Sequence, residues 1–146
     1  MTGVEALKLM ALDEEDLAVV SAHLQDAVLK VGDMTYLPRE KRFALVANRF
    51  AWEAVRGPKG ERRRTGLSFA RVLKVQRSRV RAEDPDAVLN LLAVTFTPGD
   101  APSGHVTLVF SGGAAVRLQV ECLEAELRDL GPAWETPNRP LHDLAE

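Results

Sequence analysis

The sequence FALVANRFAWE, residues 43–53, decides the fold, because its apolar side chains change position part-way along the stretch. Phe43 and Leu45 occupy odd positions, whereas Phe50 and Trp52 occupy even ones. Successive side chains of a β-strand point to opposite faces of the sheet, so a regular strand would place these two pairs on opposite faces. The pattern therefore indicates a strand that turns, in a sheet that bends at that point.

The change of face falls at Asn48-Arg49, and we interpret it as a β-bulge. A bulge adds one residue to a strand, rotates the side chains that follow and sharpens the bend of the sheet. On this interpretation Arg49 is turned toward an edge or a concavity, with its guanidinium accessible. Two alternatives stay open: a strand that is buried on both faces, and a strand that ends at Ala47 before a loop with two aromatic residues.

Length and composition are typical of one globular domain, which we place at residues 1–146. The chain has 46% hydrophobic and 27% charged residues, and a chain of this length buries roughly 70% of its unfolded surface. The N-terminus lacks the pattern of a signal peptide, and no apolar stretch approaches the roughly 20 residues that span a bilayer. Cys122 is the only cysteine, so no internal disulfide forms. We expect a cytoplasmic protein without a membrane span.

Charge is strongly segregated along the chain, although the formal net charge is only −2. Residues 1–38 hold two Lys or Arg against seven Asp or Glu, residues 39–81 hold fourteen against three, and residues 82–146 hold three against eleven. The three segments therefore carry net charges of −5, +11 and −8. A basic middle between two acidic ends is the least ordinary feature of this sequence.

Local signals predict a strand, a helix and then a run of strands. Residues 6–12 predict the first strand, and Asp13 is placed to cap a helix that extends to about Asp26. A proline at the second position of residues 37–41 suits a hairpin connection. The glycines of residues 111–113, between two alternating apolar runs, predict a second hairpin.

Two later segments complete the layout. Residues 88–96 are apolar on both faces, which is typical of a central strand covered on both sides. Residues 120–130 predict a closing helix, because Leu123, Leu127 and Leu130 form a helical stripe and Gly131-Pro132 follows it. The tail, residues 132–146, is polar and proline-rich, and we expect it to be largely irregular.

These elements predict an α+β fold, a strongly bent, mostly antiparallel sheet or roll of about seven strands with an N-terminal helix and a C-terminal capping helix. A long flat sheet would expose an apolar face and two edges, so such a sheet must curl or be covered. The layout resembles the pleckstrin-homology-like barrel, in which a C-terminal helix plugs a seven-stranded roll. The early helix departs from the simplest form of that plan, and a likeness of fold implies little about function.

The basic middle segment supplies the candidate binding surface. Arg77, Arg79 and Arg81 recur every second residue, so a strand would present them on one face toward an anionic partner. The full candidate set is Arg49, Trp52, Arg56, Lys59, Arg62, Arg63, Arg64, Arg77, Arg79 and Arg81. In this set Trp52 would supply an apolar anchor and the arginines electrostatic steering. The alternative is that these cations are solvated or paired with the acidic segments.

We assign no catalytic, cofactor-binding or metal-ligating residue. His23, His105 and His142 lack the spacing of metal ligands, and Cys122 has no histidine near it in the sequence. Nucleic-acid binding is not favoured, because no RNA-binding motif accompanies the basic run from Arg56 to Arg81, and Phe69 is the one aromatic residue inside that run.

Three segments, LQDAVLKVGDMTYLP, RFALVANRFAWE and RLQVECLEAELRDLGPAWETP, resemble the recurring segments of the family called domain of unknown function 2948. The resemblance extends from Leu7 to about His142, and it rests on whole segments instead of a catalytic signature. It implies a small alphaproteobacterial, cytoplasmic protein that consists of one domain. It implies no activity, so there are no functional residues to carry over.

We therefore expect a non-enzymatic binding or adaptor domain that uses a basic surface within residues 39–81. The main alternative is a small-ligand-binding protein or enzyme with a pocket inside the curled sheet, lined by Asn48, Arg49 and Asn90. A second alternative is nucleic-acid binding through the same cations. Unpaired strand edges would also permit a homodimer.

Overall fold

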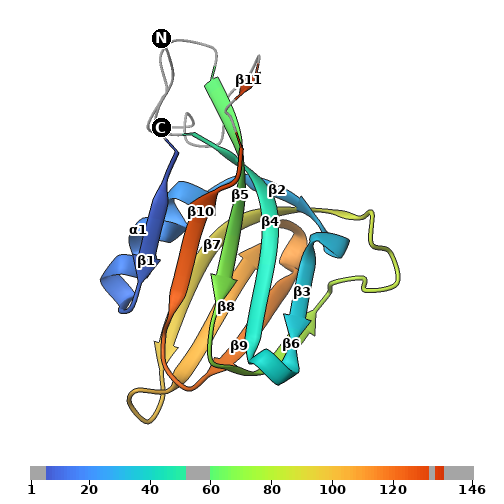
Figure 1. The fold of residues 1–146 in the computed structure, drawn as a ribbon. Coiled ribbons are helices and arrows are strands. Elements are labelled where there is room, and N and C mark those ends of the chain that lie inside the picture. The colour runs from blue at the N-terminus through green and yellow to red at the C-terminus, as the bar shows by residue number, and fades with distance from the viewer. Residues whose placement is uncertain (1–5, 52–59, 132–133, 137–146) are drawn as a thin grey trace.

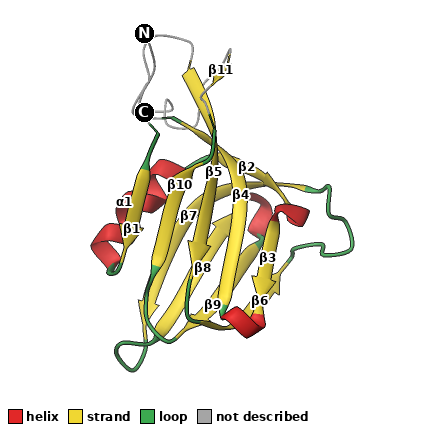
Figure 2. Cartoon of the chain, viewed as in Figure 1, coloured by secondary structure: helices red, strands yellow, loops and turns green. Residues whose placement is uncertain are grey.

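The structure is a computed structural model that describes residues 6–51, 60–131 and 134–136. Within these residues, one α-helix accompanies a single antiparallel sheet of eleven strands (Figures 1 and 2). The elements are β1 (Lys8–Ala11), α1 (Glu14–Leu24), β2 (Ala27–Lys30), β3 (Met34–Leu37), β4 (Arg42–Phe50), β5 (Gly60–Phe69), β6 (Val72–Ser78), β7 (Val88–Pro98), β8 (Gly104–Phe110), β9 (Ala115–Val120), β10 (Ala125–Asp129) and β11 (Trp134–Thr136). Short 3-10 turns are η1 (Val31–Asp33), η2 (Pro38–Glu40) and η4 (Ser111–Gly113). The predicted α+β, mostly antiparallel architecture is confirmed, with more strands than the seven or so expected.

The sheet bends so that two layers of strands face each other, and we call the bent sheet the roll. Its strand order is β1-β10-β5-β4-β2-β7-β8-β9-β6, with β11 paired to β5 and β3 paired to β4. The bend falls at β2, which shares a single residue pair, Val28 with Asn48, with β4 and four pairs with β7. In Figure 1, β10, β5, β4 and β3 form the near layer, and β7, β8 and β9 form the far layer. The described strands do not close into a barrel, because β6 and β3 do not pair with each other.

The interior of the roll is a packed apolar core. Alternate residues of each strand point inward, as the period of two requires, and both layers contribute aromatic and aliphatic side chains. The buried set includes Phe43, Leu45, Leu67 and Phe69 from the near layer and Leu108, Phe110, Val116 and Leu118 from the far layer. Each such side chain contributes about 1.5–3 kcal/mol when it leaves water, so the core is the main source of stability.

Helix α1 packs against the roll through one stripe of side chains. Leu17, Val20 and Leu24 are almost fully buried, as their spacing of three and four residues predicts. The same spacing extends the stripe to Val28, and this part of the prediction is wrong, because Val28 lies in β2. The helix begins where predicted, because the Asp13 side chain accepts a hydrogen bond of 2.8 Å from the Asp16 amide. Ser21 joins α1 to the sheet, since its hydroxyl accepts a 2.9 Å bond from the amide of Val94 in β7.

The bulge predicted at Asn48-Arg49 is wrong. β4 and β5 pair in unbroken register along the whole stretch that they share. Phe43, Leu45 and Arg49 all lie on the inward face of β4 and are at most 2% exposed, and Phe50 on the opposite face is buried as well. The apolar pattern changes phase because a charged residue takes an inward position, and not because the strand turns.

The closing helix predicted over residues 120–130 is also wrong, because this segment ends β9 and forms β10. Residues four apart share a face in a helix and in a strand, so the spacing of Leu123 and Leu127 fits both structures. The alternation decides between them, since Ala125, Leu127 and Asp129 are buried and the residues between them are not. The comparison with the pleckstrin-homology-like barrel thereby loses the C-terminal helix on which it rested.

Strand β7 is central, lying between β2 and β8 as predicted, but only one of its faces is well covered. Leu91 and Val94 are buried, whereas Val88 is 61% and Leu92 39% exposed. The expectation of cover on both sides is therefore wrong for this strand. Its outer face stays accessible because α1 packs on the side of the sheet that carries the core.

The predicted hairpins are confirmed: η2 connects β3 to β4, and η4 connects β8 to β9. Gly112 and Gly113 take positive φ in the second connection, a backbone conformation that suits glycine. In the tail, β11 adds a short strand to a segment predicted to be largely irregular. The other residues of that tail lie outside the described part of the chain.

Candidate functional site

The ten candidate residues do not form one surface. Trp52, Arg56 and Lys59 lie outside the described residues. Among the other seven, Arg49 and Arg63 are buried and Arg62 is half-buried. The exposed ones are Arg64, Arg77, Arg79 and Arg81. The structure therefore divides the predicted surface into an interior and an exterior group, and the two groups have different chemistry.

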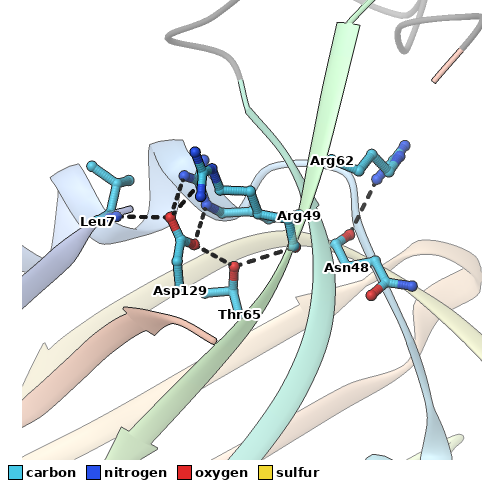
Figure 3. A network of polar contacts seen from close by, with 7 residues as sticks. Leu7, Asn48, Arg49, Arg62, Thr65 and Asp129 are labelled. Carbon is cyan, nitrogen blue, oxygen red and sulfur yellow. Dashed lines mark hydrogen bonds and ion pairs between the residues drawn. The ribbon is translucent and has the colours of Figure 1, made fainter. Parts of the chain in front are cut away.

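Arg49 and Asp129 form an ion pair inside the roll (Figure 3). Arg49 Nε donates to Asp129 Oδ1 and Arg49 Nη2 donates to Asp129 Oδ2, each at 2.9 Å. Neither side chain has any exposed area. This two-bond geometry is the strongest way in which arginine binds a carboxylate. The prediction that the Arg49 guanidinium is accessible is therefore wrong, because Asp129 neutralises it within the fold.

Three further groups surround the Asp129 carboxylate, and we call Leu7, Arg49, Arg63, Thr65 and Asp129 the Asp129 network (Figure 3). The Thr65 hydroxyl donates to Oδ1 at 2.7 Å, and the Leu7 amide donates to Oδ2 at 2.8 Å. Arg63 Nε lies 3.8 Å from Oδ2. Burial alone would raise the pKa of Asp129, but the bonds from Arg49, Leu7 and Thr65 outweigh it and hold that pKa below its ordinary value.

The Asp129 network joins four parts of the sheet and has no acceptor left for chemistry. Each oxygen of Asp129 already accepts two hydrogen bonds, from Arg49 and Thr65 on one side and from Arg49 and Leu7 on the other. A general base needs an oxygen within reach of a substrate proton. Buried carboxylates are frequent at active sites. Here the carboxylate instead links β4, β5, β10 and the residue before β1 through hydrogen bonds within the fold.

Sequence reasoning missed Thr65 and Asp129, although a signal was present. In β5, Thr65 alternates with Leu67 and Phe69, so its side chain points inward as theirs do. In β10, Asp129 likewise lies on the inward face with Leu127. A polar residue at an inward position requires a partner. A helix over residues 120–130 gives Asp129 no inward phase, so the helix prediction hides this signal.

Arg62 is held by backbone and by an aromatic ring. Its Nη1 donates to the carbonyl of Asn48 at 3.1 Å and to that of Asp26 at 3.4 Å (Figure 3). The guanidinium carbon lies 5.7 Å from the centre of the Phe50 ring, within the range of a cation–π contact. Burial lowers the pKa of Arg62, whereas the charge of Asp26 raises it. Of the three consecutive arginines 62–64, only Arg64 is exposed.

Two other cations of the basic segment are paired with the acidic C-terminal part. Arg71 Nε lies 3.4 Å from a Glu124 oxygen, and Lys41 Nζ lies 3.2 Å from a Glu121 oxygen. Both pairs are solvent-exposed, so each contributes little to stability. For these residues, the alternative that the acidic segments balance the basic middle is the correct description.

The remaining exposed cations gather at and after β6, and we call Lys74, Arg77, Arg79 and Arg81 the basic edge. All four side chains are exposed, and none forms an ion pair with another described residue. β6 is the last strand in the sheet order and pairs with β9 alone. The basic edge is therefore an unneutralised cationic margin of the far layer.

The prediction that one strand presents Arg77, Arg79 and Arg81 on one face is wrong. β6 ends at Ser78, and Arg79 takes a positive φ of 58°, so it leads the chain into a loop. A Cβ at Gly113 would lie 2.9 Å from Arg79 Nη1, so this guanidinium rests against the turn between β8 and β9. The three arginines still follow one another along one margin of the roll.

A cleft of about 260 Å³ lies between β2 and β4. It forms because η1 separates β2 from β3, so that each of these strands pairs with β4 at a different place. Its polar lining includes Lys30, Asp33, Asn48 and Arg64. Arg64 forms no ion pair within the described residues.

The three residues expected to line a pocket inside the curled sheet do not share one side of it. Asn48 and Asn90 both pair with Val28, so they lie on one face of the sheet, while Arg49 points into the core. Apolar side chains fill the interior of the roll. The three residues that were expected to line one cavity are thus separated by the sheet itself.

The described histidines and the cysteine lie on different parts of the sheet and its helix. Among the described residues, no group of three or more His, Cys, Asp or Glu side chains is arranged to hold a metal ion. His23 lies on α1 and His105 on β8, and His142 is outside the described part. In the same residues, no helix has the length and apolar character needed to cross a membrane.

Comparison with known proteins supplies the family. No curated protein and no solved structure matches the chain. The model of one family, described as protein of unknown function (DUF2948), matches residues 7–142, which is nearly the whole chain. The resemblance noted in the sequence is confirmed over the range expected, and the chain belongs to the DUF2948 family.

Proposed function

We propose that this chain is a non-enzymatic binding or adaptor domain whose contact surface for an acidic partner protein is the basic edge. The observation that carries the proposal is the contrast between two groups of cations. Arg49, Arg62 and Arg71 are held by contacts within the fold, whereas the four cations of the basic edge are exposed and have no ion pair with another described residue.

Charge complementarity favours an acidic partner. From Val72 to Arg81 the chain carries four cations and no carboxylate, and the first acidic residues, Glu83 and Asp84, follow in the next loop. Such a margin attracts a negatively charged surface and raises the rate of association, in a manner that depends on salt. The partner that fits this chemistry is a protein segment rich in Asp or Glu.

The test compares two variants that remove equal charge. The basic-edge variant, Arg77→Gln with Arg79→Gln and Arg81→Gln, removes three of the four cations of the basic edge. The near-layer variant, Lys8→Gln with Arg42→Gln and Arg128→Gln, removes three exposed cations of the near layer. Arg62 and Arg63 are unsuitable targets, because both contact the interior of the fold. Retention on immobilised polyglutamate across a salt series measures the binding.

The expected result is that the basic-edge variant binds at least ~10-fold more weakly, while the near-layer variant binds like wild type. Equal loss in both variants, or no loss in either, would contradict the proposal. Single-stranded DNA and RNA are tested in parallel, because phosphate binding depends steeply on salt. Tighter binding to nucleic acid than to polyglutamate would replace the acidic protein partner with nucleic acid.

The cleft between β2 and β4 favours a second candidate function, the binding of a small anion. Its volume of about 260 Å³ lies just below that of drug-sized ligand sites, roughly 300–1,000 Å³. Arg64 would bind a carboxylate or phosphate through two parallel bonds, with the Asn48 amide beside it. NMR titration with phosphate and acetate, for wild type and Arg64→Gln, tests this. Shift changes centred on Val28 and Val88 in wild type alone would support it.

A further inference from the structure

Two of the free edges among the described strands, β6 and β3, flank a seam in the roll. β6 pairs only with β9, and β3 pairs only with β4, within the described strands. The edges are connected at one end, where the Tyr36 hydroxyl donates to the Val72 carbonyl at 3.2 Å and the Val72 amide donates to the Lys41 carbonyl at 2.7 Å. Beyond that end, no described residue links the two edges through the backbone.

We propose that an acidic, extended segment of a partner protein adds to β6 as a further strand, in the seam between β6 and β3. The inference rests on the proposed function and specifies its binding mode. From Leu73 to Ser78, the backbone groups on the outer side of β6 make no hydrogen bond with another described residue. Unpaired backbone donors and acceptors of an edge strand are a template for a strand from another chain.

The side chains along β6 present cations on both faces of such a strand. Arg77 pairs with Val116 and lies on the inward face, and Lys74 pairs with Gln119 on the outward face. An added strand would therefore meet a positive charge whichever face its own carboxylates take. This arrangement selects an acidic segment through charge, while the backbone bonds supply the affinity.

The inward side of the seam is partly apolar. Tyr36 of β3, Val75 of β6 and Val80 of the following loop pack against the core but are only partly buried. An apolar side chain on the inward face of an added strand would cover them. The partner segment is thus expected to alternate apolar residues with Asp or Glu, which is the pattern of a strand with one covered face.

A second copy of this chain does not suit the seam. Two β6 strands side by side would bring Lys74 and Arg77 of one molecule against the same cations of the other, and like charges on paired strands are destabilising. The bulge between Val72 and Lys74 further interrupts the regular edge at the start of β6. The basic edge therefore discriminates against self-association and in favour of an acidic segment.

The experiment uses the whole chain and three short blocked peptides. The first alternates glutamate and valine, the second alternates lysine and valine, and the third is the first peptide with every amide N-methylated. The third peptide keeps the charges but has no backbone N–H to donate. Amide chemical shifts and hydrogen exchange are recorded by NMR for wild type, for Lys74→Glu with Arg77→Glu, and for Lys8→Glu with Arg128→Glu as the matched control.

We expect the glutamate peptide to bind wild type and to slow amide exchange within Leu73 to Ser78 by at least ~10-fold. The Lys74 and Arg77 variant should bind it ~10-fold more weakly, equivalent to about 1.4 kcal/mol, and the control variant should bind like wild type. The lysine and N-methylated peptides should not bind.

Each contrary result is decisive. Equal binding of the N-methylated peptide would overturn strand addition and leave the proposed function standing, because charge alone would then suffice. Binding with slowed exchange at another edge, such as β1, would also overturn the inference. If the glutamate peptide does not bind and wild type is not retained on polyglutamate, both proposals are overturned.

Discussion

Arg49 and Asp129, 80 residues apart in the sequence, lie in one bidentate ion pair inside the roll, where neither side chain has any exposed area. Removal of one member of a buried pair leaves the other as an uncompensated charge, which is far more costly than loss of a surface pair. The stability of the sheet should therefore depend strongly on this contact.

Asp129→Asn should lower the free energy of unfolding by about 3–5 kcal/mol, because the Arg49 guanidinium would stay buried without its counter-charge. Urea denaturation at neutral pH measures the change. Glu126→Gln, on the outward face of the same strand, is the matched control and should cost less than ~0.5 kcal/mol. Equal costs for the two variants would show that the ion pair adds nothing to stability.

A double-mutant cycle should show strong coupling between Arg49 and Asp129. Arg49→Met removes the charge and keeps an apolar side chain of comparable length, and it leaves the Asp129 carboxylate with Thr65 and Leu7. The double variant, Arg49→Met with Asp129→Asn, should cost about 2 kcal/mol less than the sum of the two single changes. Additive costs, within error, would contradict a direct interaction between these two side chains.

Stability should fall in acid through Asp129. Its pKa is lowered in the folded protein, so the folded state binds the proton less readily than the unfolded state, where the ordinary value is about 3.9. The contribution of this group is therefore complete above about pH 4 and is lost as the pH falls through the folded value. The difference in unfolding free energy between wild type and Asp129→Asn should shrink below pH ~4. A constant difference down to pH ~2 would contradict the assignment.

Gly104→Ala should destabilise the β7–β8 pair. A Cβ at this position would lie 2.5 Å from the Thr97 carbonyl oxygen and 2.6 Å from the Phe96 ring, so the backbone or the ring must move. We expect a loss of about 1–3 kcal/mol, the usual cost of overpacking. Gly131→Ala, where a Cβ would meet no atom within 4 Å, is the control and should change thermal stability little. Similar melting temperatures for both variants would refute the close contact.

The sequence predicts helix α1 and the hairpin between β8 and β9 well, because the signals for both are local. Asp13 caps α1 as expected, and the buried stripe of Leu17, Val20 and Leu24 follows from helical spacing alone. Glycine-containing turns likewise locate the hairpin between β8 and β9. Signals of this kind depend on neighbours within a few residues, so they can be read without knowledge of the tertiary structure.

The C-terminal segment could not be assigned in the same way. Leu123 and Leu127 are four residues apart, a spacing that serves a helix and a strand equally, and the following Gly-Pro ends either element. The partner that favours a strand is β5, whose register with β10 pairs Leu127 with Leu67. Leu67 and Leu127 are 60 residues apart in the sequence, so no local pattern reports their pairing.

The candidate site was predicted in part for the same reason. Composition draws attention to the cations of residues 39–81, and the basic edge lies within that range. Alternation alone does not reveal that Arg49 faces inward, because its partners Thr65 and Asp129 come from other strands. Charge counts along a sequence describe how many cations there are, whereas only the register of the strands determines which ones stay exposed.

The pairing of β1 with β10 has a consequence for synthesis. Leu7 and Asp129, which exchange two hydrogen bonds, are separated by 122 residues. At about 5–20 residues per second, the ribosome releases the later strand roughly 6–25 s after the earlier one. During that interval Leu9 and Ala11 are without the strand that pairs with them, so the nascent chain cannot complete its sheet before β10 has been synthesised.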